Sequence, residues 1–183
     1  MDDEHELLMR AHRFDETALA AIFDRYYGMI ARYTYLHTGH AQTAEDLAAQ
    51  VFHRLLDALR AGHGPERALK AWLFRVASNL IIDEVRRGKH RDHEPLEESL
   101  HTVETVENAA AYAMQLADLR AALAQLTDSQ RSIIVLRYLM EMSNEETAHI
   151  LGMTVGAVKA QQVRALAALR RTLNKEASRE SST

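Results

Sequence analysis

Apolar residues recur along this chain at the three- and four-residue spacing of amphipathic helices, in two groups separated by a polar stretch. In the first group the spacing predicts helices over residues 3–12, 15–37, 43–60 and 66–87. In the second group it predicts helices over residues 107–126, 128–140, 144–151 and 155–174. We therefore expect an all-α fold made of two small helical domains.

Local signals support several of the predicted helix ends. Pro65 stands where the first turn of a helix tolerates proline. Ser143 and Glu146 match a capping box, in which each side chain bonds to the backbone amide of the other residue. Gly152 then ends that helix, and Thr154 caps the next one. A short helix, a tight turn and a newly capped helix predict a helix-turn-helix.

The polar stretch between the two groups is acidic and contains Pro95, so we interpret it as a linker. Residues 89–115 carry 2 basic and 6 acidic side chains. Proline and clustered polar residues interrupt helical patterns. The predicted organisation is a first domain over 1–88, a linker over 89–111, a second domain over 112–175 and a disordered tail over 176–183.

Composition narrows the class of protein further. The chain has 183 residues, of which 47% are hydrophobic and 26% charged, as in ordinary globular proteins. Seven glycines and two prolines are too few for the frequent turns of a β-sandwich or barrel. Without cysteine, disulfides and thiolate chemistry are excluded. The acidic start and the lack of an apolar run of about 20 residues favour a soluble, cytoplasmic protein without membrane insertion.

The predicted helix-turn-helix, residues 143–171, is the strongest candidate for DNA binding. Residues 151–175 include five basic side chains and no acidic one. Ala148 stands where the two helices would cross, and a small side chain allows a close approach. Gln161 and Arg164 suit base edges. Three cations on the same helix suit phosphates: Lys159, Arg170 and Arg171. A plain helical hairpin with a basic solvated face is the alternative.

A second basic segment covers residues 67–91, where seven basic side chains stand against two acidic ones. A cationic helix with amide and aromatic groups suits a melted DNA strand, because cations follow the backbone while flat groups meet unstacked bases. Arg75 and Asn79 are the candidates for such contacts. Trp72 fits the apolar core as well as a base contact.

The predicted helix over residues 43–60 offers a candidate protein interface. Its polar face presents Asp46, Gln50 and Arg54, together with the aromatic Phe52. An exposed aromatic ring beside an acidic group is typical of protein interfaces. Burial of Phe52 under a neighbouring helix is the alternative.

We find no signature of an enzyme. The chain contains no phosphate-binding loop, no dinucleotide fingerprint and no nucleophile elbow. The pairs His37–His40 and His90–His93 have metal-ligand spacing, but neither belongs to an HExxH motif, and both fall at helix ends or in the linker. We therefore expect no catalytic residue, cofactor or metal, with a metal-dependent helical enzyme as the alternative.

Three segments, taken in this order, resemble the extracytoplasmic-function (ECF) RNA polymerase sigma factors. Residues 44–52, AEDLAAQVF, resemble the family's polymerase-binding helix. Residues 71–87, AWLFRVASNLIIDEVRR, resemble its helix for the −10 promoter element. Residues 136–159 resemble its helix-turn-helix for the −35 element. The resemblance covers residues 14–175.

The resemblance implies a non-enzymatic factor that binds bacterial core RNA polymerase and promoter DNA and directs transcription initiation, under the control of an anti-sigma factor. Polymerase binding would fall to Asp46, Leu47, Gln50, Phe52 and Arg54. The −10 element would be read by Trp72, Arg75, Asn79, Arg86, Arg87 and Lys89. The −35 element would be read by Thr154, Val155, Ala157, Lys159, Ala160, Gln161 and Arg164. The acidic linker would thread the RNA channel of the polymerase.

Two departures from the family pattern change these expectations. Gln50 stands where the family often has Glu, which softens one polar contact with the polymerase. Residues 160–170 carry fewer cations than the family pattern, so we expect more amide-based readout of the −35 element and weaker salt dependence.

The alternative function is a stand-alone regulator that binds a palindrome as a dimer through residues 143–171. That alternative leaves residues 44–54 and 67–91 unexplained.

Overall fold

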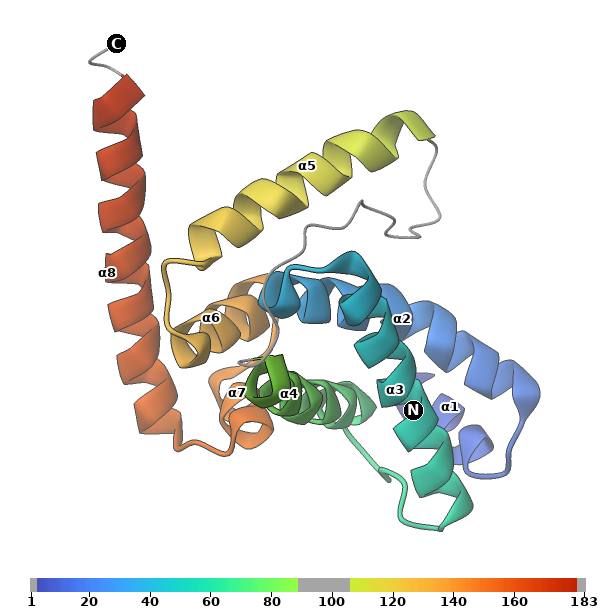
Figure 1. Cartoon of the computed structure of the whole chain (residues 1–183). Coiled ribbons are helices and arrows are strands. Elements are labelled where there is room, and N and C mark those ends of the chain that lie inside the picture. Colours follow the sequence, from blue (N-terminus) through green and yellow to red (C-terminus); the bar gives the residue numbers. More distant parts are fainter. Residues whose placement is uncertain (1–2, 89–105, 181–183) are drawn as a thin grey trace. The chain divides into compact units, whose positions relative to one another are not determined.

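The computed structural model describes residues 3–88 and 106–180 (Figure 1). Every regular element in these ranges is a helix, which confirms the predicted all-α fold. The chain divides into two compact units, Met1–His101 and Thr102–Thr183. The exact boundaries of the predicted linker stay a prediction.

In the first unit the helices are α1 (Asp3–Ala11), α2 (Glu16–Thr38), α3 (Ala41–Arg60) and α4 (Leu69–Gly88). Helices α2, α3 and α4 pack against one another, and α1 packs against α2. The side chains between them are apolar, and the largest fully buried ones include Ile22, Ile30, Tyr33, Leu47, Leu55, Leu73 and Phe74. Burial of each such side chain contributes about 1.5–3 kcal/mol, so the amphipathic pattern is what holds this unit together.

Helix α4 begins at Leu69 rather than at residue 66. The prediction that Pro65 lies in its first turn is therefore wrong. Ala68 has a φ of 50°, in the left-handed region, and a residue in that conformation cannot belong to the helix. Pro65 lies in the preceding loop, where its carbonyl oxygen is 3.0 Å from Nε2 of His12.

The first amide of α4 is bound by a side chain from another helix. The Leu69 N–H donates a hydrogen bond of 3.1 Å to Oε1 of Glu4 in α1. The other carboxylate oxygen of Glu4 accepts a hydrogen bond from the Tyr26 hydroxyl in α2. Burial and this hydrogen bond raise the pKa of Tyr26, so the hydroxyl keeps its proton and remains a donor. Glu4 thus joins α1, α2 and α4 at one point.

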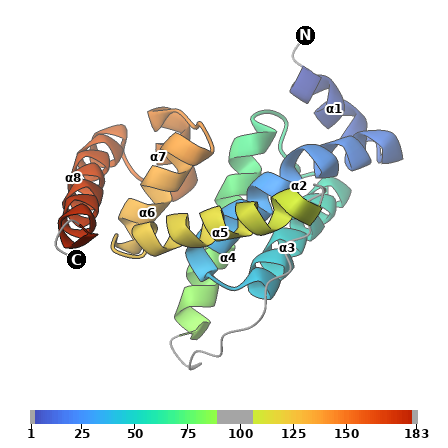
Figure 2. The same cartoon turned by 90° about the horizontal axis from the view of Figure 1, so that it is seen from above.

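In the second unit the elements are α5 (Val106–Leu123), α6 (Asp128–Ile134), the π-helical turn η1 (Val135–Leu139), α7 (Asn144–Leu151) and α8 (Val155–Glu180). Helix α8 packs against α5, α6 and α7, and Figure 2 shows α6 and α7 beside it. Three boundaries differ from the predicted ones. Helix α5 begins within one residue of the predicted start but ends at Leu123 rather than at 126, and η1 interrupts the helix predicted over 128–140. Helix α8 runs past 174 into the predicted tail, because no glycine or proline interrupts its later turns.

Helices α7 and α8 form the predicted helix-turn-helix. Gly152 has a φ of 64° and ends α7 in the left-handed conformation that glycine adopts without strain. Ser143 and Glu146 form the predicted capping box through bonds of 3.0 and 2.7 Å. Ala148 is buried in one cluster with Val158, which confirms that a small residue lies where the two helices meet.

Candidate functional site

Helix α4 carries the residues predicted to contact the −10 element. Arg75 and Asn79 are both exposed, and their i, i+4 spacing places them one above the other on the same helix face. Trp72 is only half-buried, so its ring is shared between the core and the surface. Lys89 lies outside the described residues. This face therefore combines a guanidinium, an amide and part of an indole ring.

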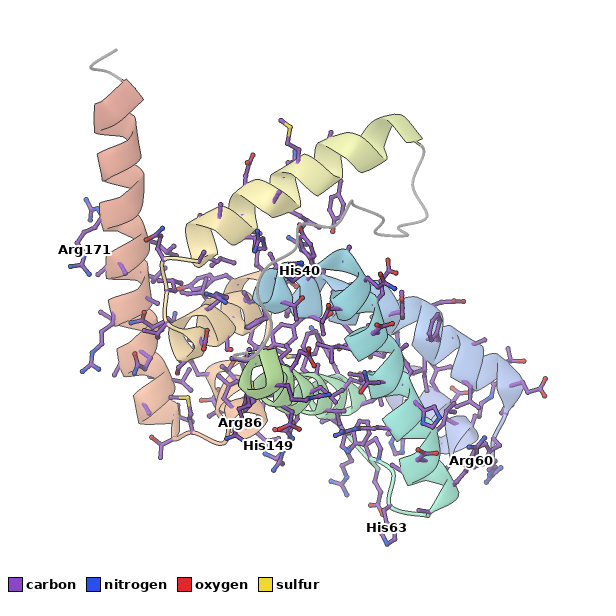
Figure 3. The ribbon with its side chains drawn as sticks, viewed as in Figure 1. His40, Arg60, His63, Arg86, His149 and Arg171 are labelled. Carbon is purple, nitrogen blue, oxygen red and sulfur yellow. The ribbon has the colours of Figure 1, made fainter. Side chains whose placement is uncertain are left out.

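Two exposed arginines follow at the end of α4. Arg86, labelled in Figure 3, lies 3.9 Å from Asp83, and Arg87 lies 3.4 Å from Glu84. Arg87 also donates a hydrogen bond of 3.3 Å to the carbonyl oxygen of Asp83. Exposed ion pairs contribute only about 0–1 kcal/mol, so a phosphate can replace the carboxylates at low cost. The cluster thus supports the helix end and keeps two guanidinium groups at the surface.

Helix α3 presents the predicted polar face. Asp46, Gln50 and Arg54 follow one another at i+4 steps, and all three are exposed. Leu47 is buried, so it supports this face from within the core rather than forming part of its surface.

The aromatic residue exposed at this surface is Phe23 rather than Phe52. Phe52 is only 8% exposed, so of the two alternatives the structure confirms burial of this ring under a neighbouring helix. Its ring centroid lies 5.0 Å from that of Phe23 and 6.1 Å from that of Tyr27, both in α2. Phe23, which is 43% exposed, supplies the surface ring instead. Its helical spacing is typical of a core position, so the sequence gives no signal of this role.

An acidic group lies beside this aromatic cluster. Partial burial raises the pKa of Tyr27, and the nearby charges of Glu45 and Asp46 raise it further. The start of α3 therefore combines carboxylates with the rings of α2. Such a mixture of acidic and aromatic groups suits a partner surface that offers cations and apolar side chains.

Helix α8 begins as predicted and presents most of the predicted −35 residues. The Ala157 N–H donates a hydrogen bond of 3.1 Å to the hydroxyl of Thr154, which confirms Thr154 as the cap. Val155 packs against the buried cluster of the helix-turn-helix. The exposed members of the predicted set are Thr154, Lys159, Ala160 and Arg164, whereas Val155, Ala157 and Gln161 are half-buried. Arg171 extends from the same helix further on (Figure 3).

One hydrogen bond made by α8 is not indicated by the sequence. Nε2 of Gln162 donates a hydrogen bond of 2.7 Å to the hydroxyl oxygen of Tyr138 in η1. The contact spans 24 positions in the sequence, so local pattern does not reveal it. It ties the π-helical turn to the middle of α8 and engages the Gln162 amide within the protein.

Two further positions on α8 leave open space at the surface. Val163 is 68% exposed although it is apolar. A Cβ atom built on Gly156 would meet no heavy atom within 4 Å, so packing does not require a glycine there. Packing within the described part of this unit therefore dictates the residue type at neither position.

Among the described residues, no group of three or more His, Asp or Glu side chains is arranged to hold a metal ion. Nδ1 of His37 lies 2.8 Å from the carbonyl oxygen of Tyr33 in its own helix. His90 and His93 lie outside the described residues.

In the described part of the chain, no helix combines the length and apolar character needed to cross a membrane.

The fold and these surfaces define a two-unit helical protein. One unit contains a helix-turn-helix with a basic second helix, and the other contains a cationic helix and an acidic–aromatic surface. Comparison with family models gives the same division. The model of Sigma-70 region 2 matches residues 22–91, and the model of Sigma-70 region 4 matches residues 122–171.

Curated relatives identify the family. The chain is 34% identical over 165 residues to the ECF RNA polymerase sigma factor SigL of Mycobacterium tuberculosis, covering 85% of this chain and 88% of SigL. It is 31% identical over 175 residues to the ECF RNA polymerase sigma factor BldN of Streptomyces coelicolor, covering 94% of this chain and 66% of BldN. The chain belongs to the ECF RNA polymerase sigma factors, which are non-enzymatic transcription initiation factors.

Solved structures share the fold. CnrH, solved in complex with the cytosolic domain of CnrY, matches with a TM-score of 0.73 and 26% identity, over 95% of this chain and 99% of CnrH. The sigma factor RpoE of Bartonella quintana, solved with the anti-sigma factor NepR, matches with a TM-score of 0.67 and 22% identity, over 85% of this chain and 96% of RpoE.

Proposed function

We propose that this chain binds bacterial core RNA polymerase in the cytoplasm, reads a −10 promoter element with α4 and a −35 element with α8, and directs transcription initiation. The observation that carries the proposal is the presence of two exposed faces suited to DNA, one on each unit. A regulator that used the helix-turn-helix alone would leave the face of α4 and the polar face of α3 without a role.

The face of α4 suits a melted strand. Arg75 can follow the phosphate backbone, while the Asn79 amide can bond to the edge of an unpaired base. The half-buried ring of Trp72 offers a flat surface beside them. Arg86 and Arg87 extend the cationic path towards the end of the helix. We assign this face to recognition and opening of the −10 element.

The face of α8 suits an intact duplex. In a helix-turn-helix the second helix enters the major groove with its N-terminal part against the bases. Thr154, Lys159 and Arg164 are exposed along this part of α8. Their hydroxyl, ammonium and guanidinium groups can bond to phosphates or to guanine edges. We assign this face to the −35 element.

The polar face of α3 suits the polymerase. Asp46, Gln50 and Arg54 offer both charges and an amide in one row, and the exposed ring of Phe23 lies on the neighbouring helix. Aromatic anchors ringed by polar groups are typical of protein interfaces. This face is distinct from the row formed by Arg75 and Asn79 on α4, so polymerase and DNA need not compete.

We further propose that a partner protein holds the factor inactive. The similar protein CnrH is described in complex with the cytosolic domain of CnrY. A partner that covers the face of α3 or the DNA-binding faces would block promoter recognition without unfolding either unit. An anti-sigma factor is the class of protein that acts in this way.

The first test is co-elution with polymerase. The purified chain is mixed with bacterial core RNA polymerase and analysed by gel filtration, with the polymerase-free chain run in parallel. Co-elution near one-to-one is expected. A chain that is folded by circular dichroism but does not co-elute would contradict the proposal and favour the stand-alone regulator.

A further inference from the structure

Val163 is an apolar side chain that the fold does not use. It is 68% exposed, although the neighbouring Val158 and Ala165 on the same helix are fully buried. A β-branched residue at an exposed helix position gains no packing and has a lower helix propensity than Ala. Its presence there therefore calls for an explanation other than the stability of the free protein.

The side chains around Val163 are those of a DNA-binding surface. Lys159 and Ala160 lie one turn earlier on the same face, and Arg164 follows directly. All three are exposed. Residues 151–175 include no acidic side chain that would repel phosphates. Leu166, one turn later, is 41% exposed as well, so Val163 is the first of two exposed large apolar side chains that stand among the cations of this helix.

The side-chain amides of Gln161 and Gln162 do not form the exposed surface around Val163. Gln162 donates its amide to Tyr138, and Gln161 is half-buried. The exposed groups between Lys159 and Arg164 are therefore the methyl groups of Ala160 and Val163. The expectation of an amide-based readout stays a prediction, because Gln161 keeps part of its surface accessible.

In the major groove, the 5-methyl group of thymine is the only methyl group on a base edge. Cytosine has only a C5–H at that position, and the remaining groups are hydrogen-bond donors or acceptors, which an apolar side chain leaves unpaired. We propose that Val163 is a specificity-determining residue that selects a thymine in the −35 element through contact with this methyl group. The inference rests on the proposed role of α8 in binding the −35 element.

The test uses the holoenzyme formed from the full chain and core polymerase. Templates with a randomised −35 element are transcribed, and the transcripts are sequenced to find the preferred element. Each thymine of that element is then replaced by deoxyuridine, which removes only the methyl group. For one thymine we expect about a fourfold loss of initiation, the factor that corresponds to burial of one methyl-sized group. With Val163→Ala this loss should disappear.

Met114→Ala is the matched control. Met114 lies on α5 of the same unit and is 69% exposed, so the variant removes an equally exposed apolar side chain elsewhere. It should respond to deoxyuridine as the unmodified chain does. Thermal unfolding of both variants checks that the units remain folded.

Two outcomes overturn the inference while leaving the proposed function intact. One is an equal response to deoxyuridine in the unmodified chain and in Val163→Ala. The other is a preferred −35 element in which no thymine methyl matters. Failure of the proposed function has a different signature, in which Lys159→Ala and Arg164→Ala also leave the preferred element and the rate of initiation unchanged.

Discussion

Asn79 provides the sharpest residue-level test of the proposed −10 surface. Because its amide is exposed on α4, Asn79→Ala should leave the fold intact. Loss of one base contact worth about 1 kcal/mol corresponds to about a fivefold decrease in open complexes. Permanganate reactivity of the −10 region measures this directly. Gln125→Ala removes an exposed amide from the second unit and serves as the control. Unchanged promoter opening in Asn79→Ala would exclude the role given to this residue.

Asp46 tests the polar face of α3 in the same way. Asp46→Arg reverses an exposed charge. Like charges that face each other across an interface cost on the order of several kcal/mol, so this variant should bind polymerase at least about tenfold more weakly. Glu66→Arg makes the same charge change at an exposed loop position before α4 and should bind normally. Equal retention of both variants by immobilised polymerase would show that the interface lies elsewhere.

At the scale of single residues, helical periodicity predicts the exposure of polar side chains well and the exposure of aromatic rings poorly. Asp46 and Asn79 are exposed as their spacing indicates. Phe52 is buried and Phe23 is exposed, because the crossing of α2 and α3 decides which ring is covered. That crossing depends on contacts between helices, which the pattern of one helix does not contain.

At the scale of elements, the start of α4 depends on α1. Glu4→Ala removes the acceptor shared by the Leu69 N–H and the Tyr26 hydroxyl. A hydrogen bond to a charged group contributes about 1.5–3 kcal/mol, so we expect a loss of free energy of unfolding of this order. Chemical denaturation of the full chain measures it.

Glu4→Gln separates the charge from the hydrogen bonds. The amide oxygen can still accept from the Leu69 N–H, so this variant should lose less stability than Glu4→Ala. Glu6→Ala, which removes an exposed carboxylate from the same helix, controls for changes within α1 itself. Equal stability of Glu4→Ala and Glu6→Ala would mean that Glu4 does not hold α4.

Helix ends that depend on neighbouring residues were accessible from the sequence, whereas those that depend on distant residues were not. The ends at Ser143 and Gly152 follow local capping rules and agree with the structure. The start of α4 at Leu69 depends on Glu4, 65 positions away. The contact between Tyr138 and Gln162 is likewise non-local. Local rules contain no information on such contacts.

At the scale of the whole molecule, binding to DNA should require the polymerase. Two units that each contact a short stretch of DNA bind weakly until the polymerase fixes the spacing between them. On one labelled promoter fragment, we expect the polymerase-free chain to bind at least about a hundredfold more weakly than the holoenzyme. Comparable affinities in a filter-binding assay at the same salt concentration would favour the stand-alone regulator.

The two-domain organisation follows from the sequence because each group of amphipathic segments has its own core. Net charge is a poorer guide at this scale. The total of −4 argues against a nucleic-acid partner, yet residues 89–115 carry 6 acidic and only 2 basic side chains, while residues 151–175 carry five basic side chains and no acidic one. The distribution of charge along the chain therefore indicates function better than its sum does.

Gly156 is a position at which a larger residue would fit and would make the folded protein more stable. Alanine fits there without contact, and an exposed Gly→Ala change within a helix typically raises the free energy of unfolding by about 0.5–1 kcal/mol. Natural proteins tolerate such a deficit when activity requires it. Gly156→Ala should therefore give a higher melting temperature together with weaker initiation from −35-dependent promoters. That pair of results would mean that selection on α8 has favoured the close approach of its backbone to DNA over the rigidity of the helix.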